Sequence, residues 1–213
     1  MSGKRIVDIS MTFRSPMRGF KKSIAKSISE DGWNASTLEI YSHAGTHMDA
    51  PVHFDVNPGT IENIPVDRFL CNCHIVRLSP VPDRFLIKPD HLGKTASRVK
   101  PGEGILFHTG WSQFAEDPAR YRDLLPRISA DLAQWLVEKG VNLVGVEPPS
   151  IADVNKLDEL QKIHRILLEG NMIIVEGLCN LEEVRSDYVQ LIALPLKVEG
   201  GDGAPVRAIV IEN

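Results

Sequence analysis

The chain has 213 residues, of which 43% are hydrophobic and 24% charged, with a formal net charge of −4. This balance predicts a single globular domain over 1–213 and excludes collagen-like and disordered classes, while the acidic charge argues against nucleic acid as a partner. Three cysteines, no leader-like N-terminus and no apolar run of about 18 residues exclude a secreted scaffold or a membrane protein, and predict a cytoplasmic location.

The first elements of the chain are a short strand at 6–10 and a basic segment after it. From Arg14 to Lys26 there are five lysines or arginines and no acid, with a proline and a glycine among them. This composition predicts a surface loop or a weak helix that is solvated. A loop this long inside a domain is also often a lid or a binding element.

Two helices are expected in the second half of the chain. The first begins at Ser129, whose hydroxyl suits an N-cap, and ends at Gly140. The second covers 155–169, where an apolar stripe at helical spacing includes His164, so this histidine should face inward. Alternating or apolar segments predict strands at 6–10, 36–41, 73–78, 104–109, 141–146, 172–175, 189–196 and 206–211. Because helices and strands alternate only in mid-chain, we expect a mixed, β-rich α/β fold.

The segment 43–55 gathers three of the seven histidines within eleven residues, together with a carboxylate. A glycine and a proline within it disfavour a helix, so an extended or turning backbone is expected. On a strand, His47 and Asp49 would point to the same side, and His43 could join them across a bend at Gly45. Two imidazoles and a carboxylate are suitable ligands for Zn²⁺, Mn²⁺ or Fe²⁺, and they leave coordination positions of the ion open for water. A metal site is therefore favoured over a chance group of surface histidines.

Three further residues gain meaning beside this cluster. His53 is either another ligand or an acid–base group, since an ordinary imidazole titrates near pH 6.5. Glu176 ends the apolar strand 172–175, where a buried carboxylate needs a partner. Alone, His164 is explained as a core histidine and Glu176 as half of an ion pair with an arginine. Together, they could hold a second metal ion that Asp49 bridges to the first.

The pattern His-x-Gly-Thr-His-x-Asp-x-Pro-x-His-Phe, present from His43 to Phe54, resembles the signature of the putative cyclase family. These metal-dependent hydrolases include bacterial kynurenine formamidase and isatin hydrolase. Later stretches of the chain are also similar to the family: 106–111, 145–150, 176–178, 191–197 and 203–208.

The resemblance implies a swivelling β/β/α-type fold and a homodimer or higher oligomer. In the formamidase branch it implies two zinc ions, with His53 as the acid–base group. The first ion would be held by His43, His47 and Asp49, and the second by Asp49, His164 and Glu176.

Two departures fall where substrate contacts are expected. Formamidases usually carry Asp-Thr-Pro-Ser where this chain has Glu147 followed by Pro-Pro-Ser, and they carry a Trp-Pro-Gly-Asp stretch in place of the basic segment. Phe54 and Trp111 are further candidates for the pocket wall, and the cations of the basic segment for binding a substrate carboxylate.

The leading hypothesis is hydrolysis of a small-molecule amide by metal-activated water, with N-formylkynurenine as substrate. Ring opening of a cyclic amide such as isatin, or of a lactone, is the alternative within the family. A serine or cysteine nucleophile is disfavoured because no Gly-x-Ser-x-Gly elbow is present and Cys71 and Cys73 are typical of buried apolar positions. A non-catalytic metal-binding protein is the alternative from another class.

Overall fold

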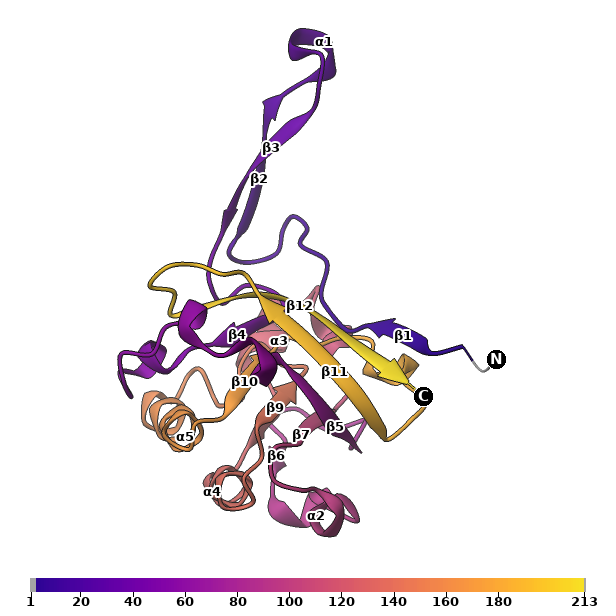
Figure 1. The fold of residues 1–213 in the computed structure, drawn as a ribbon, viewed down its shortest axis with the longest axis vertical. Helices are drawn as coiled ribbons and strands as arrows, with labels where there is room; N and C mark the ends of the chain where they lie inside the picture. Colours follow the sequence, from indigo (N-terminus) through magenta and orange to yellow (C-terminus); the bar gives the residue numbers. More distant parts are fainter. Residues whose placement is uncertain (1–2, 213) are drawn as a thin grey trace.

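The computed structural model describes residues 3–212, and a closed barrel of seven strands forms its centre (Figure 1). The barrel strands are β4 (His47–Asp49), β5 (Leu70–Arg77), β7 (Gly104–His108), β9 (Leu143–Val146), β10 (Ile173–Glu176), β11 (Tyr188–Pro195) and β12 (Gly203–Glu212). Their order is β12-β11-β5-β7-β9-β10-β4, and β4 pairs again with β12, which closes the ring. The first strand, β1 (Arg5–Asp8), pairs with β12 outside the ring. The expected mixed, β-rich α/β class is therefore confirmed.

One half of the barrel is parallel and carries the helices. Strands β5, β7, β9 and β10 run parallel, whereas β4, β11 and β12 pair antiparallel with their neighbours. The helices are α2 (Thr95–Arg98), α3 (Pro118–Asp123), α4 (Ala130–Glu138) and α5 (Leu157–Glu169). A two-stranded sheet of β6 (Leu86–Ile87) and β8 (Arg127–Ile128) lies beside them. Parallel strands need long crossovers, which explains the helix–strand alternation in mid-chain.

Alternation along the strands gives the protein two apolar cores. Leu106 of β7 and Val175 of β10 belong to a cluster drawn mainly from strands. Their neighbours Phe107 and Ile174 belong to a second cluster, which also contains Leu136 of α4. Since successive side chains of a strand face opposite sides, one core fills the barrel and the other lies under the helices.

The helix boundaries follow local side-chain chemistry. Ser129 caps α4, its hydroxyl accepting a hydrogen bond from the backbone N–H of Leu132 at 3.1 Å, as expected. The second helix begins two residues later than predicted, at Leu157. The reason is a turn in which the Asp153 side chain accepts from the N–H of Asn155. No helix within 3–212 has both the length and the apolarity needed to span a membrane.

The prediction of a loop or weak helix for the basic segment is wrong in its second half. Residues 20–26 form β2 (Phe20–Lys26), which pairs antiparallel with β3 (Ala35–Ile40), and the short helix α1 (Ile28–Asp31) lies at the tip. This hairpin, here called the arm, extends away from the barrel (Figure 1). The strand expected at 36–41 is confirmed as β3, whereas β2 is exposed along nearly its whole length and lacks the alternation of buried and exposed residues by which a strand is recognised.

Candidate metal centre

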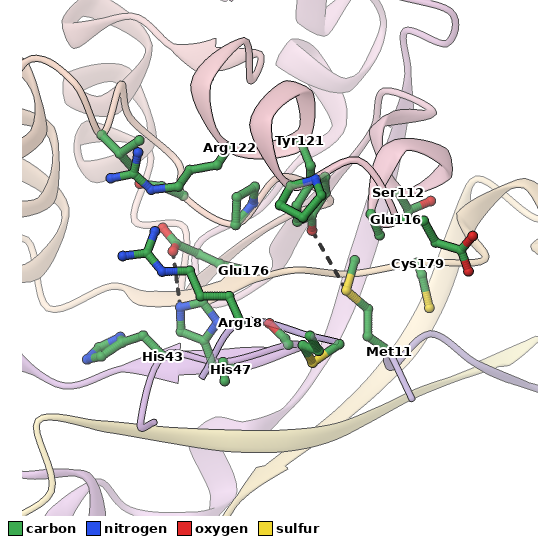
Figure 2. A pocket seen from close by; sticks show the side chains of 18 of the residues that line it. Met11, Arg18, His43, His47, Ser112, Glu116, Tyr121, Arg122, Glu176 and Cys179 are labelled. Atoms are coloured by element: carbon green, nitrogen blue, oxygen red, sulfur yellow. Dashed lines mark hydrogen bonds and ion pairs between the residues drawn. The ribbon is translucent and has the colours of Figure 1, made fainter. Parts of the chain in front are cut away.

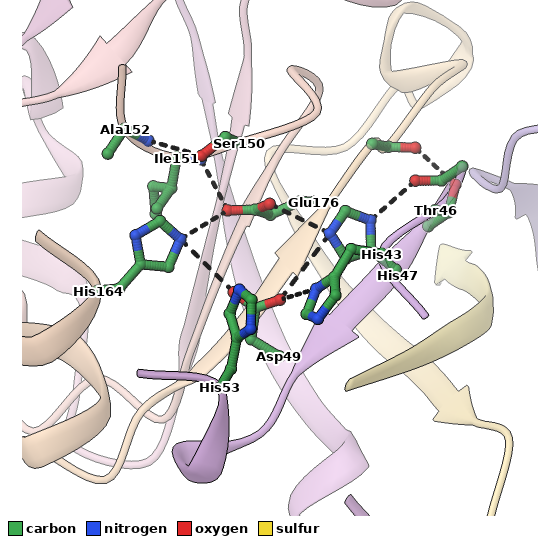
Figure 3. A network of polar contacts seen from close by, with 12 residues as sticks. His43, Thr46, His47, Asp49, His53, Ser150, Ile151, Ala152, His164 and Glu176 are labelled. Carbon is green, nitrogen blue, oxygen red and sulfur yellow. Dashed lines mark hydrogen bonds and ion pairs between the residues drawn. The ribbon is translucent and has the colours of Figure 1, made fainter. Parts of the chain in front are cut away.

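The register of β4 brings the first acidic and imidazole groups together. Glu176 on β10 lies directly opposite His47, and Gly203 on β12 lies opposite Asp49. The His47 Nε2 atom is 3.2 Å from Glu176 Oε2 and 3.8 Å from Asp49 Oδ1 (Figure 3). The side chains of His47, Asp49 and Glu176 are all buried. The strand geometry expected for His47 and Asp49 therefore exists, and strand pairing adds Glu176 to it.

A bend before β4 returns His43 to the same cluster. Gly45 adopts φ +61°, a conformation that glycine reaches without strain. The His43 Nδ1 atom then lies 2.9 Å from Asp49 Oδ1. His53, on the short 3₁₀ helix η1 (Pro51–Phe54), stacks on the His43 ring with 3.9 Å between centroids.

His164 reaches the cluster from α5. Its Nδ1 donates to the carbonyl oxygen of Leu160 at 2.7 Å, which turns Nε2 toward Glu176 Oε1 at 3.4 Å and Asp49 Oδ2 at 3.6 Å. His47 is held in the same way, because its Nδ1 donates to the carbonyl oxygen of Gly45 at 3.0 Å. In both rings the hydrogen bond assigns a proton to Nδ1 and directs Nε2 toward the carboxylates, where it is available to a metal ion. That is the arrangement of metal-ligating histidines.

The donor set fits a divalent cation. Asp49 Oδ2 is buried and has no hydrogen-bond partner among the described residues, which is rare for a buried carboxylate oxygen. Ligand atoms of His47, Asp49 and Glu176 lie within 4.8 Å of one another, as do those of His43, Asp49 and His53. The two oxygens of Asp49 face different imidazoles, Oδ1 those of His43 and His47 and Oδ2 that of His164.

Electrostatics in the cluster favour positive charge. Burial alone would lower the pKa of His43, but the hydrogen bonds and charges of Asp49 and Asp202 raise it to about 9. Burial would raise the pKa of Asp49, yet the nearby imidazoles hold it below its ordinary value. The pKa of His164 is raised against burial by its contact with Glu176. The raised pKa values of the two imidazoles report nearby carboxylates, and the lowered pKa of Asp49 reports nearby imidazoles, so the carboxylates here are held ionised at a buried point, where they would stabilise a metal cation.

The cluster opens into a cavity of about 1560 Å³. Predicted residues that line it include Phe54, which stacks on His164 with centroids 4.3 Å apart, and two arginines of the basic segment, Arg14 and Arg18. Arg14 is paired with Glu116 at 2.7 Å. No hydrogen bond or ion pair joins Arg18 to any other residue within 3–212, and its side chain points toward the candidate centre (Figure 2).

The other two predicted substrate contacts do not line this cavity. Trp111 and Glu147 are both fully buried. The Glu147 carboxylate accepts hydrogen bonds from three backbone N–H groups and two hydroxyls within the turn 109–112. With both oxygens engaged, it has no side exposed to a substrate. Glu147 instead holds the turn behind the cavity wall, and Trp111 packs within that turn.

The cysteines lack the features of a nucleophile. Cys71 and Cys73 are buried in the barrel core, as predicted. Cys179 lines the cavity, but burial and then the charge of Asp8 raise the pKa of its thiol to about 12. A thiol with this pKa is almost entirely protonated at neutral pH and reacts slowly.

One side chain at the centre was missed by sequence reasoning. Asp202 Oδ2 lies 3.1 Å from His43 Nε2 and 3.8 Å from His53 Nδ1. The aspartate stands in a turn among three glycines, Gly200, Gly201 and Gly203, whose composition indicates only a loop. The similarity of 203–208 to the family pointed to this region but not to the residue.

Comparison with known proteins agrees with this architecture. A family model described as "Putative cyclase" matches residues 7–153. Kynurenine formamidase from Salinibacter ruber is 32% identical over 181 residues, covering 85% of this chain and 81% of that protein. The corresponding protein of Erythrobacter litoralis is 29% identical and covers 99% of this chain and 95% of its own length.

Solved structures show the same fold. Isatin hydrolase A from Labrenzia aggregata, bound to benzyl benzoate, superposes with a TM-score of 0.87 at 22% identity, covering 98% of this chain and 93% of that one. A potential metal-dependent hydrolase with cyclase activity gives 0.81 at 25% identity and covers 99% of both chains. The fold implied by the histidine signature is thereby confirmed, and the chain belongs to the putative cyclase family.

Proposed function

We propose that this protein is a metal-dependent amide hydrolase, with N-formylkynurenine as the leading substrate and kynurenine and formate as products. The observation that carries the proposal is the convergence of buried imidazoles and carboxylates from separate elements at one end of an open cavity. A structural zinc site closes all four positions, usually with cysteine, whereas this set contains none and faces a cavity. This difference favours catalysis over a purely metal-binding role.

The ligand side chains are those that converge in the structure. One or two divalent ions would be held by His43, His47, Asp49, His164 and Glu176. Zinc is the first candidate, and manganese and iron(II) accept the same donors. When bound, such an ion supplies a Lewis acid that polarises a carbonyl and lowers the pKa of water toward about 7.

His53 is the proposed acid–base residue. It lies beside the ligands without belonging to a strand, and its side chain is partly exposed to the cavity. A proton taken by this imidazole can return to the departing nitrogen, which completes the cleavage of the C–N bond. Phe54 supplies an apolar wall next to it, suited to an aryl ring.

Arg18 favours a substrate that carries a carboxylate. It is an arginine without a partner among residues 3–212, and it points toward the proposed reaction centre (Figure 2). A guanidinium binds a carboxylate through paired hydrogen bonds. N-formylkynurenine offers that group, whereas isatin does not. Ring opening of a neutral cyclic amide or a lactone therefore remains the second candidate.

The two substrate classes are separated by one substitution. Arg18→Ala should raise KM for N-formylkynurenine by roughly tenfold, the value of one charge-assisted contact, and leave isatin hydrolysis unchanged. Arg14→Ala is the matched control, since Arg14 is already paired with Glu116. Equal KM values for the parent and Arg18→Ala would refute the carboxylate contact.

The function itself is tested with two variants of the site. Asp49→Ala should lose metal, because it removes the carboxylate that faces His43, His47 and His164. His53→Ala should keep metal but lose turnover by roughly 10²- to 10⁴-fold. Metal content by mass spectrometry and kynurenine release measure the two effects. Parental turnover by His53→Ala, or no hydrolysis of formyl-anilines, cyclic amides and lactones by the metal-loaded protein, would refute the proposal.

A homodimer is proposed as the assembly, with the arm contacting the second copy. An isolated two-stranded hairpin is marginally stable, yet this one exposes Ile24 (81%), Ile28 (67%) and Trp33 (57%). The barrel exposes a second apolar set that could receive it, including Leu194 and Leu196. Light scattering should give twice the chain mass, and Ile24→Ser with Trp33→Ser should shift it toward the monomer. A monomeric parent at micromolar concentration would refute this assembly.

A cytoplasmic location is part of the proposal. All three cysteines are free in the structure, and two of them lie adjacent in the core without being joined. Free thiols persist in reducing compartments.

A further inference from the structure

We propose that Asp202 is a positioning residue, which orients His43 and fixes its proton so that the ring can bind a metal ion. The inference rests on the proposed metal site and concerns a residue outside its ligand set. Each of the three candidate imidazole ligands has a hydrogen-bond acceptor on the side of the ring that faces away from the cluster.

His43 lies between two aspartates. Its Nδ1 faces Asp49 Oδ1 at 2.9 Å, inside the cluster, and its Nε2 faces Asp202 Oδ2 at 3.1 Å, on the outer side (Figure 3 shows the inner contact). Asp202 is itself anchored, because its carbonyl oxygen accepts from the N–H of Ala50 at 2.9 Å, at the end of β4. The aspartate and the ligand strand are therefore fixed relative to each other.

The contact with Asp202 holds a proton on the outer nitrogen. An ionised carboxylate only accepts hydrogen bonds, so each aspartate favours a proton on the ring nitrogen that it faces. A cation bound beside Asp49 would replace the inner proton on Nδ1, while Asp202 would keep the outer proton on Nε2. Without Asp202, the outer nitrogen would lose its acceptor, and the proton would no longer be held there.

The same arrangement recurs at the other two histidines. His47 and His164 each donate one ring N–H to a backbone carbonyl, of Gly45 and Leu160 respectively, and direct the other nitrogen inward. His43 alone of the three uses a side chain as its outer acceptor. Its orientation can therefore be tested by substitution, whereas the backbone acceptors of the others cannot be removed in this way.

Packing on both sides of the His43 ring supports a positioning role. The His53 ring stacks on it, and a Cβ added at Gly203 would lie 2.7 Å from His43 Cε1. Asp202 Oδ2 is also 3.8 Å from His53 Nδ1, close enough for electrostatic attraction but too long for a hydrogen bond. Asp202 thus contacts the edges of both stacked rings.

The experiment measures metal affinity of the chelator-stripped full chain. Zn²⁺ or Mn²⁺ is titrated against a chromogenic chelator for the parent, Asp202→Ala, Asp202→Asn and Asp187→Ala. Asp202→Ala should weaken binding by roughly 10- to 100-fold, the usual effect of removing an outer partner of a ligand. Asp202→Asn should stay within about threefold of the parent, because the amide oxygen still accepts from Nε2. Asp187, an exposed aspartate bonded to Arg77, is the control and should have no effect.

The outcomes separate this inference from the function it rests on. Parental affinity in Asp202→Ala would overturn it while leaving the metal site intact. Equal loss in Asp202→Asn and Asp202→Ala would also overturn it, since the negative charge or direct coordination would then be required. A parent that binds no metal would refute the proposed function as well. Circular dichroism of each stripped variant shows that the chain remains folded.

Discussion

Glu147 provides a demanding test of how the cavity wall is built. Its carboxylate is fully buried and accepts from the N–H groups of Thr109, Gly110 and Trp111, and from the hydroxyls of Thr109 and Ser112. Glu147→Ala leaves the buried N–H groups of Thr109 and Trp111 without an acceptor, at about 1–3 kcal/mol each, as well as the half-buried N–H of Gly110. The expected loss in the free energy of unfolding is therefore at least about 2 kcal/mol. The free energy of unfolding of a natural domain is only about 5–15 kcal/mol. Glu147→Ala therefore removes a large share of it.

Glu147→Gln keeps one carbonyl oxygen in place and gives the milder comparison. Hydrogen bonds to a charged acceptor contribute about 1.5–3 kcal/mol and neutral ones about 0.5–1.5 kcal/mol, while neutralising a buried group recovers part of its desolvation. We expect a loss of about 1–3 kcal/mol, smaller than for alanine. Urea denaturation followed by tryptophan fluorescence measures both values, and metal content should match the parent. A loss below about 0.5 kcal/mol in both variants would refute the assigned role.

Two further predictions concern the site. Gly203→Ala should weaken metal binding, because the added Cβ would lie 2.7 Å from His43 Cε1 and from the Met48 carbonyl oxygen. Gly200→Ala is the control: the space around it is open, so metal affinity should not change, although its φ of +66° should cost about 1–2 kcal/mol of stability. Equal metal affinities of the two variants would contradict the packing argument. Burial and nearby acids raise the pKa of the Cys179 thiol to about 12. At pH 8 it should therefore react with iodoacetamide at least roughly tenfold more slowly than free cysteine, as measured by mass spectrometry of the labelled protein. Labelling as fast as that of free cysteine would contradict the raised pKa.

The parts of the centre that sequence could predict are those governed by local periodicity. A period of two places His47 and Asp49 on one side of a strand, and a helical stripe turns His164 inward. The capping hydroxyl of Ser129 is equally local. Each of these follows from a few neighbouring residues.

What sequence could not supply is long-range pairing. That Glu176 lies opposite His47 depends on β4 entering between β10 and β12, strands that follow it by more than a hundred residues. Asp202 has no periodic neighbours in its glycine-rich turn. Glu147 was expected at the cavity because it stands where formamidases usually carry an aspartate, but the backbone N–H groups that enclose it have no side-chain signature. In the arm, β3 was predicted as a strand at 36–41, whereas β2 was missed because its basic sequence lacks a buried face.

The central claim is that imidazoles and carboxylates from β4, β10, α5 and the preceding bend form one cation site. The most direct test is diffraction from zinc- or manganese-loaded crystals, with anomalous data on both sides of the metal edge. The account predicts one or two peaks about 2.0–2.2 Å from nitrogen and oxygen atoms of His47, Asp49 and His164. A metal-loaded crystal with no peak among these side chains would contradict it.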